Sequence, residues 1–248
     1  MKRFLRISGS VIAFVLLVLT VIWWMADEKE PKGSSGEAAD LMAQKMMAAV
    51  NKPAWDSTAY VQWTFRGEHA FLWDKERHIV QVDWEPYRVL LDINNIKGKA
   101  YQEDKELPAE QAKPLVMEAW EYFCNDSFWL NAVVKAFDPG TERSLVTLKD
   151  GRQGLKVAYS QGGVTPGDSY VWILDENHRP TSWKMWVSII PVDGMEFTWD
   201  KWDTLSTGPV VSTFHQSSIL DLDISEVKAG GSYEEFGLEE DPFGSLYH

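Results

Sequence analysis

The stretch WTFRGEHAFLWDKERHIVQV, residues 63–82, decides the fold class of this 248-residue chain. Large apolar residues alternate along it in three short runs, which are separated by the polar breaks Arg66-Gly67-Glu68 and Asp74-Lys75-Glu76. A period of two puts alternate side chains on one face of a strand, and breaks this short are typical of hairpin turns. The stretch therefore predicts a meander of antiparallel strands.

The same period extends over most of the chain. Eight further strands are expected at residues 87–93, 98–102, 144–149, 154–160, 169–175, 181–190, 195–203 and 209–216. Most gaps between strands hold two to six residues, too few for the crossover helix that parallel strands require. We therefore expect an α+β protein in which a single, strongly curved antiparallel sheet, a half-barrel of about eleven strands, is lidded by two helices.

Two segments have the period of an amphipathic helix. GEAADLMAQKMMAAVN, residues 36–51, follows Ser35, a residue type that caps helices, and stops at Asn51-Lys52-Pro53. PAEQAKPLVMEAWEYFCND, residues 108–126, opens with a proline and ends in Asn and Asp, which favour capping over the helix interior. These segments are the predicted lid.

The N-terminus predicts a membrane anchor. Three basic residues lie within residues 1–6, and the next 20 residues, 7–26, carry no charge and end in Trp23-Trp24-Met25-Ala26. At 1.5 Å per residue a helix of this length spans about 30 Å, the thickness of a hydrocarbon core. A cleaved signal peptide is the alternative, although bulky Trp24 stands where a small residue is expected. By the positive-inside rule, residues 1–26 form a single-pass anchor in the cytoplasmic (inner) membrane, with the globular domain on its periplasmic side.

The rest of the chain divides by composition. Residues 27–36, DEKEPKGSSG, predict a polar linker, and residues 37–216 predict the globular domain. Residues 217–248 carry eight acidic residues and one lysine, which predicts a flexible, solvated tail. A docking peptide for an envelope protein is the other interpretation of this tail.

The composition excludes several functions. The net charge of −13 argues against nucleic-acid binding, which needs clustered Lys and Arg. One cysteine, Cys124, excludes an internal disulfide and a CxxC zinc site, and the five histidines lack metal-ligand spacing. The glycine-containing loop at residues 160–168 leads into a strand and lacks a lysine, so it is not a phosphate cradle. We therefore expect no enzyme, no metal and no cofactor.

The aromatic content suggests a binding site for an apolar ligand. The chain has 13 Trp, 8 Tyr and 11 Phe, more large rings than two modest helices readily cover. A curved sheet under a lid can leave a concave apolar cavity, whereas in the alternative the same rings fill the core. The cavity candidates are Trp63, Phe65, Phe71, Trp73, Val82, Trp84, Trp172, Trp183, Met185 and Trp199. Sugar binding would instead need exposed indoles, with Trp120, Trp129, Trp172, Trp186 and Trp202 as candidates.

The order of elements resembles the periplasmic lipoprotein-carrier fold of LolA and LolB. The resemblance covers residues 37–216 and is carried by the first amphipathic helix, the 63–82 meander and the hairpin VWILDENHRPTSWKMW, residues 171–186. It implies an incomplete, strongly bent barrel, lidded by helices, whose apolar interior receives the acyl chains of lipoproteins. Those carriers are soluble or lipid-anchored, whereas a transmembrane anchor is predicted here.

These observations lead to one hypothesis and one rival. The hypothesis is a membrane-tethered envelope protein that binds an apolar ligand, a lipid or a lipoprotein acyl chain, in an aromatic-lined half-barrel. The rival is a non-enzymatic interaction or structural module with a filled core and an acidic, partner-binding tail.

Overall fold

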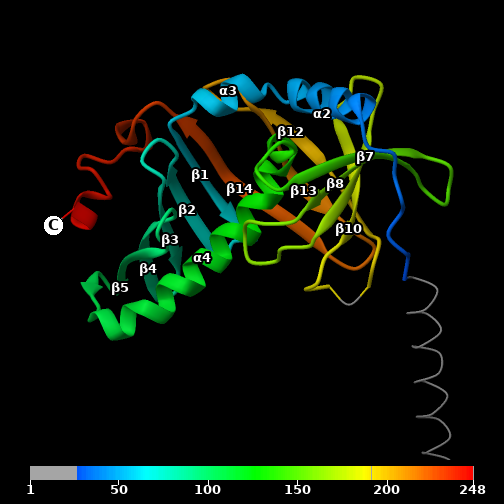
Figure 1. Ribbon diagram of the computed structural model, residues 1–248. Helices are drawn as coiled ribbons and strands as arrows, with labels where there is room; N and C mark the ends of the chain where they lie inside the picture. Colours follow the sequence, from blue (N-terminus) through cyan, green and yellow to red (C-terminus); the bar gives the residue numbers. More distant parts are fainter. Residues whose placement is uncertain (1–26, 191, 248) are drawn as a thin grey trace, which may run out of the picture.

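The computed structural model describes residues 27–190 and 192–247, in which fourteen strands form two antiparallel sheets (Figure 1). The nine-stranded sheet has the order β12-β13-β14-β1-β2-β3-β4-β5-β6 and the five-stranded sheet the order β11-β10-β9-β8-β7. The strands of the first sheet are β1 (Tyr60–Phe65), β2 (His69–Asp74), β3 (Ile79–Trp84), β4 (Tyr87–Asp92), β5 (Lys97–Gln102), β6 (Lys105–Glu106), β12 (Asp200–Thr204), β13 (Val210–Gln216) and β14 (Asp221–Gly230). Those of the second are β7 (Thr141–Thr147), β8 (Gln153–Tyr159), β9 (Ser169–Leu174), β10 (Pro180–Trp186) and β11 (Met195–Thr198).

The antiparallel α+β class is confirmed, but the expectation of a single sheet of about eleven strands is wrong. The predicted strand 195–203 is broken at Trp199, where the chain leaves the five-stranded sheet as β11 and enters the nine-stranded sheet as β12. The backbone N–H of Trp199 still donates to Thr181 on β10 (2.8 Å), whereas Asp200 already pairs with Phe214 on β13. One residue thus joins the two sheets.

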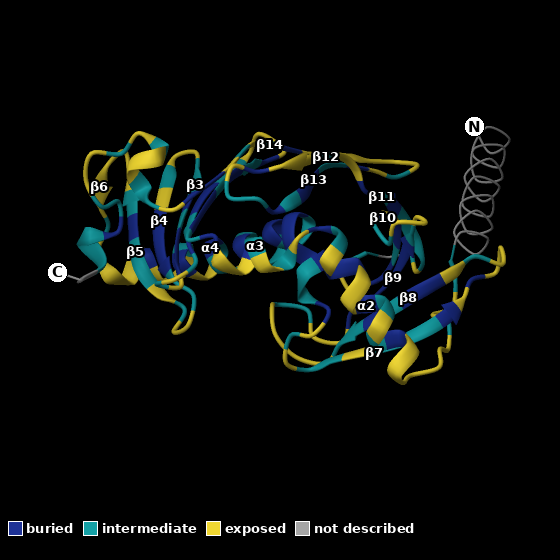
Figure 2. Cartoon of the chain, turned by 90° about the horizontal axis from the view of Figure 1, so that it is seen from above, coloured by how far each residue is buried: buried dark blue, intermediate teal, exposed yellow. Residues whose placement is uncertain are grey.

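The helices are α2 (Glu37–Ala49), α3 (Lys52–Ser57) and α4 (Ala109–Asn131), followed by the short 3₁₀ helices η1 (Ala132–Lys135), η2 (Tyr233–Phe236) and η3 (Gly244–Tyr247). Helix α4 runs diagonally across the sheet, and α2 and α3 lie together along one end of it (Figure 1). Seen from above, α4 lies between the strands of the two sheets (Figure 2). The helices therefore cover the inner face, as expected of a lid.

Two details of the helices differ from expectation. Gly36, not Ser35, occupies the N-cap of α2, and no side chain caps this end. Helix α4 continues past Asp126 to Asn131, and Asp126, which was expected to end it, is buried on its inner side. Asn51 adopts a left-handed conformation (φ 54°) between α2 and α3, where the stop was predicted.

The predicted linker is bound to the domain as a strap along the five-stranded sheet. The side chain of Lys184 contacts Glu28 at 2.6 Å, with 14% and 12% of the two side chains exposed, and Lys156 contacts Glu30 at the same distance. The indole Nε1 of Trp186 donates to the carbonyl of Glu28 (2.6 Å). The strap thereby lies over an outer apolar cluster of Val146, Leu148, Val171, Ile173 and Trp186.

Removal of Lys184 should release the strap. Lys184→Met leaves the carboxylate of Glu28 largely buried without its cation, which should cost about 2 kcal/mol. We expect faster trypsin cleavage after Lys29 and Lys32 in the strap, measured by mass spectrometry. The double variant Lys184→Met/Glu28→Gln should restore the protection, and equal cleavage of all three proteins would contradict the strap.

The C-terminal segment is not the flexible tail that was predicted. Residues 221–230 form β14, which pairs with β1 and β13 inside the nine-stranded sheet. The segment after it packs on the outer face, where Phe243 is completely buried beside Leu72, Ile79 and Leu90. The Arg77 guanidinium holds this segment through Asp241, with Nη1 to Oδ2 at 2.6 Å, and this contact lowers the pKa of the carboxyl.

Truncation of Phe243 therefore tests whether the C-terminal segment is docked. Phe243→Ala should lower the free energy of unfolding by about 3 kcal/mol, because it leaves a cavity in the outer cluster. Urea denaturation measures this, with Phe236→Ala as a less buried comparison. A change below about 1 kcal/mol would fit a mobile tail instead.

Among residues 27–190 and 192–247, no helix is both long and apolar enough to span a bilayer. The predicted anchor, residues 1–26, lies outside the described residues.

Candidate functional site

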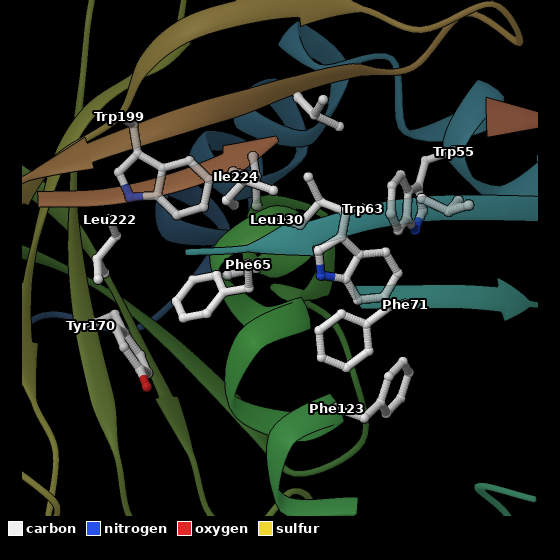
Figure 3. Packing of buried hydrophobic residues seen from close by; sticks show 14 of the residues in the cluster. Trp55, Trp63, Phe65, Phe71, Phe123, Leu130, Tyr170, Trp199, Leu222 and Ile224 are labelled. Carbon is white, nitrogen blue, oxygen red and sulfur yellow. The ribbon is translucent and has the colours of Figure 1, made fainter. Parts of the chain in front are cut away.

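All ten predicted cavity residues belong to one hydrophobic core between the sheets and α4. Eight of them are buried, and Trp73 and Trp84 pack against that core with part of their surface exposed. Side chains alternate along β10, where Trp183 and Met185 face this interior and Trp186 faces the outer cluster. Figure 3 shows side chains of β1, β2, β9 and α4 directed into the same interior. Their role in binding stays a prediction.

The interior is filled in this conformation. Four indoles have at most 1% of their surface exposed: Trp63, Trp172, Trp183 and Trp199. Side chains this buried border no space large enough for an acyl chain. A ligand can therefore enter only if a helix or strand moves out of the interior. The contacts between aromatic side chains show which element fills it.

Helix α4 supplies the rings at the centre of the interior. Phe123 contacts Trp63 and Trp73, with ring centroids 6.3 and 5.2 Å apart. One turn further on, Phe128 contacts Tyr159 (5.4 Å). Trp129, the next residue, contacts Trp183 at 4.9 Å and Phe197 at 4.9 Å. The helix thus occupies the concave face that the sequence assigned to a ligand.

The contact between α4 and the sheet leaves polar atoms unpaired. Among the described residues, eight buried side-chain nitrogen or oxygen atoms have no hydrogen-bond partner: Nε1 of Trp63, Trp73, Trp172, Trp183 and Trp199, Nε2 of His215, Oδ1 of Asn131 and the hydroxyl of Tyr159. Asn131 lies on α4, and five of the other residues touch an α4 ring. Each unpaired buried group costs about 1–3 kcal/mol. Six of the eight unpaired atoms therefore lie on α4 or on residues that touch its rings.

A polar contact between His69 and Asp126 ties α4 to the sheet. The Nδ1 atom of His69 on β2 lies 2.7 Å from Oδ2 of Asp126, and the imidazole stacks on Tyr122 at 3.8 Å. Burial raises the pKa of Asp126, and the hydrogen bond to His69 opposes that shift. Asp126 was expected only to cap the helix. It falls in the apolar stripe of Val116, Ala119, Phe123 and Leu130, and an acidic residue in such a stripe signals a buried partner.

His215 is the second titratable group in the interior. It is completely buried between Trp129 and Trp199, at 5.2 and 4.5 Å, and Nδ1 lies 3.1 Å from the carbonyl oxygen of Thr198. Burial lowers the pKa of His215 to about 4. The imidazole is therefore neutral at physiological pH, with Nδ1 as donor to Thr198.

The low pKa of His215 predicts acid sensitivity. Unfolding returns the pKa to about 6.5, so the unfolded chain binds more protons between pH 6.5 and 4, and stability falls with pH in this window. From pH 7.5 to 5 this residue should contribute a loss of about 2 kcal/mol. Urea denaturation at both pH values should show that loss reduced in His215→Gln and retained in His178→Asn, a substitution in the β9–β10 turn. An unchanged pH dependence in His215→Gln would contradict it.

Other candidate chemistry finds little support in the described residues. Burial raises the pKa of Cys124, inside α4, to about 12, which keeps the thiol protonated. No group of three or more His, Cys, Asp or Glu side chains in the described ranges is arranged to hold a metal ion. None of the five indoles considered for sugar stacking is exposed. A groove of about 370 Å³ at the hairpin tips includes Trp84, but none of the other nine cavity candidates lines it.

Comparisons with known proteins return similarities to solved structures alone. No family model matches the chain, and no curated protein matches it significantly. A DUF1329 family protein from Desulfovibrio piger superimposes with a TM-score of 0.42 at 10% identity, over 87% of this chain and all of that one. An outer membrane lipoprotein-sorting protein domain from Vibrio parahaemolyticus gives 0.33 at 8% identity, over 83% and 98%. The second is the kind of protein that the sequence resembles, but TM-scores below 0.5 support no inference about function, which has to come from the chain's own residues.

Proposed function

We propose that this chain is a membrane-tethered envelope protein that binds an apolar ligand, the acyl chain of a lipid or lipoprotein, between its curved sheet and α4. The observation that carries the proposal is the cluster of unpaired polar atoms where α4 meets the sheet. Buried polar groups in proteins are normally hydrogen-bonded, so these atoms are groups that the polar head of a ligand can pair with once α4 withdraws.

The proposed mechanism is an exchange of α4 for ligand. Withdrawal of the helix frees the aromatic concave face. An acyl chain that binds there replaces the apolar contacts of the helix, with a free-energy gain of about 0.8 kcal/mol for each CH₂ group buried. The freed indole N–H groups are donors for the carbonyl oxygens at the head of such a chain. The contact between His69 and Asp126 holds the helix in place when no ligand is bound.

The proposal is tested by quenching with brominated fatty acid. Bromine quenches indole fluorescence at contact, so the full chain should show saturable quenching by dibromostearate and none by stearate. Trp23 and Trp24 are replaced by Phe, so that only the indoles of the domain report.

Two variants sharpen the test. Asp126→Asn weakens the charge-assisted bond to His69, which should lower the apparent Kd about tenfold. Asp83→Asn, beside the groove at the hairpin tips, should leave the Kd unchanged. Quenching that is absent or unsaturable in all three proteins would overturn the proposal.

The second candidate function is that of a structural or interaction module with a filled core. It is favoured by the indoles that are at most 1% exposed. In that case the acidic residues after β14 form the surface that binds a partner. Failure of the quenching test would favour this candidate.

A further inference from the structure

Two neighbouring loops expose aliphatic side chains at one end of the sheet. Ile219 and Leu220, before β14, are 75% and 39% exposed, and Ile189, after β10, is 64% exposed. With the half-buried Ile190, these residues form what we name the aliphatic rim. Three of the six exposed large hydrophobic side chains in the described residues thus lie in these two loops.

The strand pairing brings the two loops together. Because β12 continues β11 and pairs antiparallel with β13, the residues that follow Gln216 run back alongside β11. The backbone N–H of Gln216 donates to Oγ1 of Thr198 (3.0 Å). Both loops therefore lie at the same end of the strands, which is the lower end of the sheet in Figure 1.

The rim carries no charged residue, unlike several turns at the opposite end of the sheet. No charged residue lies between Lys184 and Asp193 or between Gln216 and Asp221. The turns at the opposite end of the sheet, in contrast, include residues 74–78, DKERH, and residues 175–179, DENHR. Exposure of uncharged aliphatic side chains to water is unfavourable, whereas their contact with an apolar medium is favourable.

The start of the described chain is fixed beside this rim. The backbone N–H of Glu28 donates to the carbonyl of Asp193 (2.9 Å), and that of Asp193 donates to the carboxylate of Asp27 (3.2 Å). A Cβ at Gly194, whose φ is +79°, would lie 2.6 Å from the Cβ of Glu28. Residue 27, which follows the uncharged stretch 7–26, is therefore bonded to the β10–β11 loop that carries Ile189.

We propose that the aliphatic rim contacts the lipid bilayer at the place where the N-terminal segment enters it. The inference rests on the membrane tether of the proposed function. The strap binds Asp27 to the β10–β11 loop. Because no free linker separates residue 27 from this loop, the rim is held close to the point where the N-terminal segment meets the membrane. The domain then has a fixed orientation, with the rim in the headgroup region and the charged turns facing the periplasm.

The test places a fluorescent reporter on the rim of the full chain. In a Cys124→Ala background, single cysteines at Ile189, Ile219 and, as control, Asn177 are labelled with NBD. The protein is reconstituted in vesicles of phosphatidylethanolamine and phosphatidylglycerol with spin-labelled lipids. We expect a blue shift and quenching at positions 189 and 219, neither effect at 177, and loss of the effect at 189 when Ile219→Asp is added.

The outcomes distinguish the rim inference from the membrane tether on which it rests. If the protein floats with the vesicles but labels at 189 and 219 behave like the label at 177, the rim inference is wrong and the tether stands. If the protein does not float with vesicles, the tether and the rim fail together, while acyl-chain binding is still decided by the quenching test.

Discussion

The rest of the structure depends on how the chain passes from one sheet to the other. Trp199 keeps its backbone bond to β10 while the next residue already pairs with β13, so the strand changes sheets without a loop. The indole of Trp199 fills the corner and contacts Trp172, Trp183 and His215. Two sheets joined in this way enclose a concave face too large for the strands alone to cover, and α4 covers it.

Each apolar face of the sheets is covered by a different part of the chain. Helix α4 covers the inner face, the strap covers the outer cluster of the five-stranded sheet, and the C-terminal segment covers that of the nine-stranded sheet. The two outer covers are held by well-paired groups, Lys184 with Glu28 and Arg77 with Asp241. The inner cover leaves polar atoms unpaired. This contrast is why the inner face is the one proposed for a ligand.

Local pattern predicted the strands and the membership of the core, because alternation fixes which side chains share a face. It did not predict the break at Trp199, although the alternation of Met195, Phe197 and Trp199 ends there, with Lys201 where an apolar residue is due. The preference of Asp for helix caps predicts a helix end at Asp126, whereas His69, 57 residues away in sequence, stabilises it inside α4. The strap and β14 were assigned to solvent from their polar composition. Their partners are distant in sequence, so composition alone could not reveal the pairing.

The position of β14 also constrains how the protein is made. The last strand of the chain lies in the middle of the nine-stranded sheet, where Tyr60 of the first strand pairs with Gly230. The sheet cannot be completed until nearly the whole chain has been synthesised, and such distant contacts slow folding. A chain that still lacks β14 therefore has a gap between β1 and β13, whereas the local hairpins of β1–β6 and of the five-stranded sheet do not depend on it.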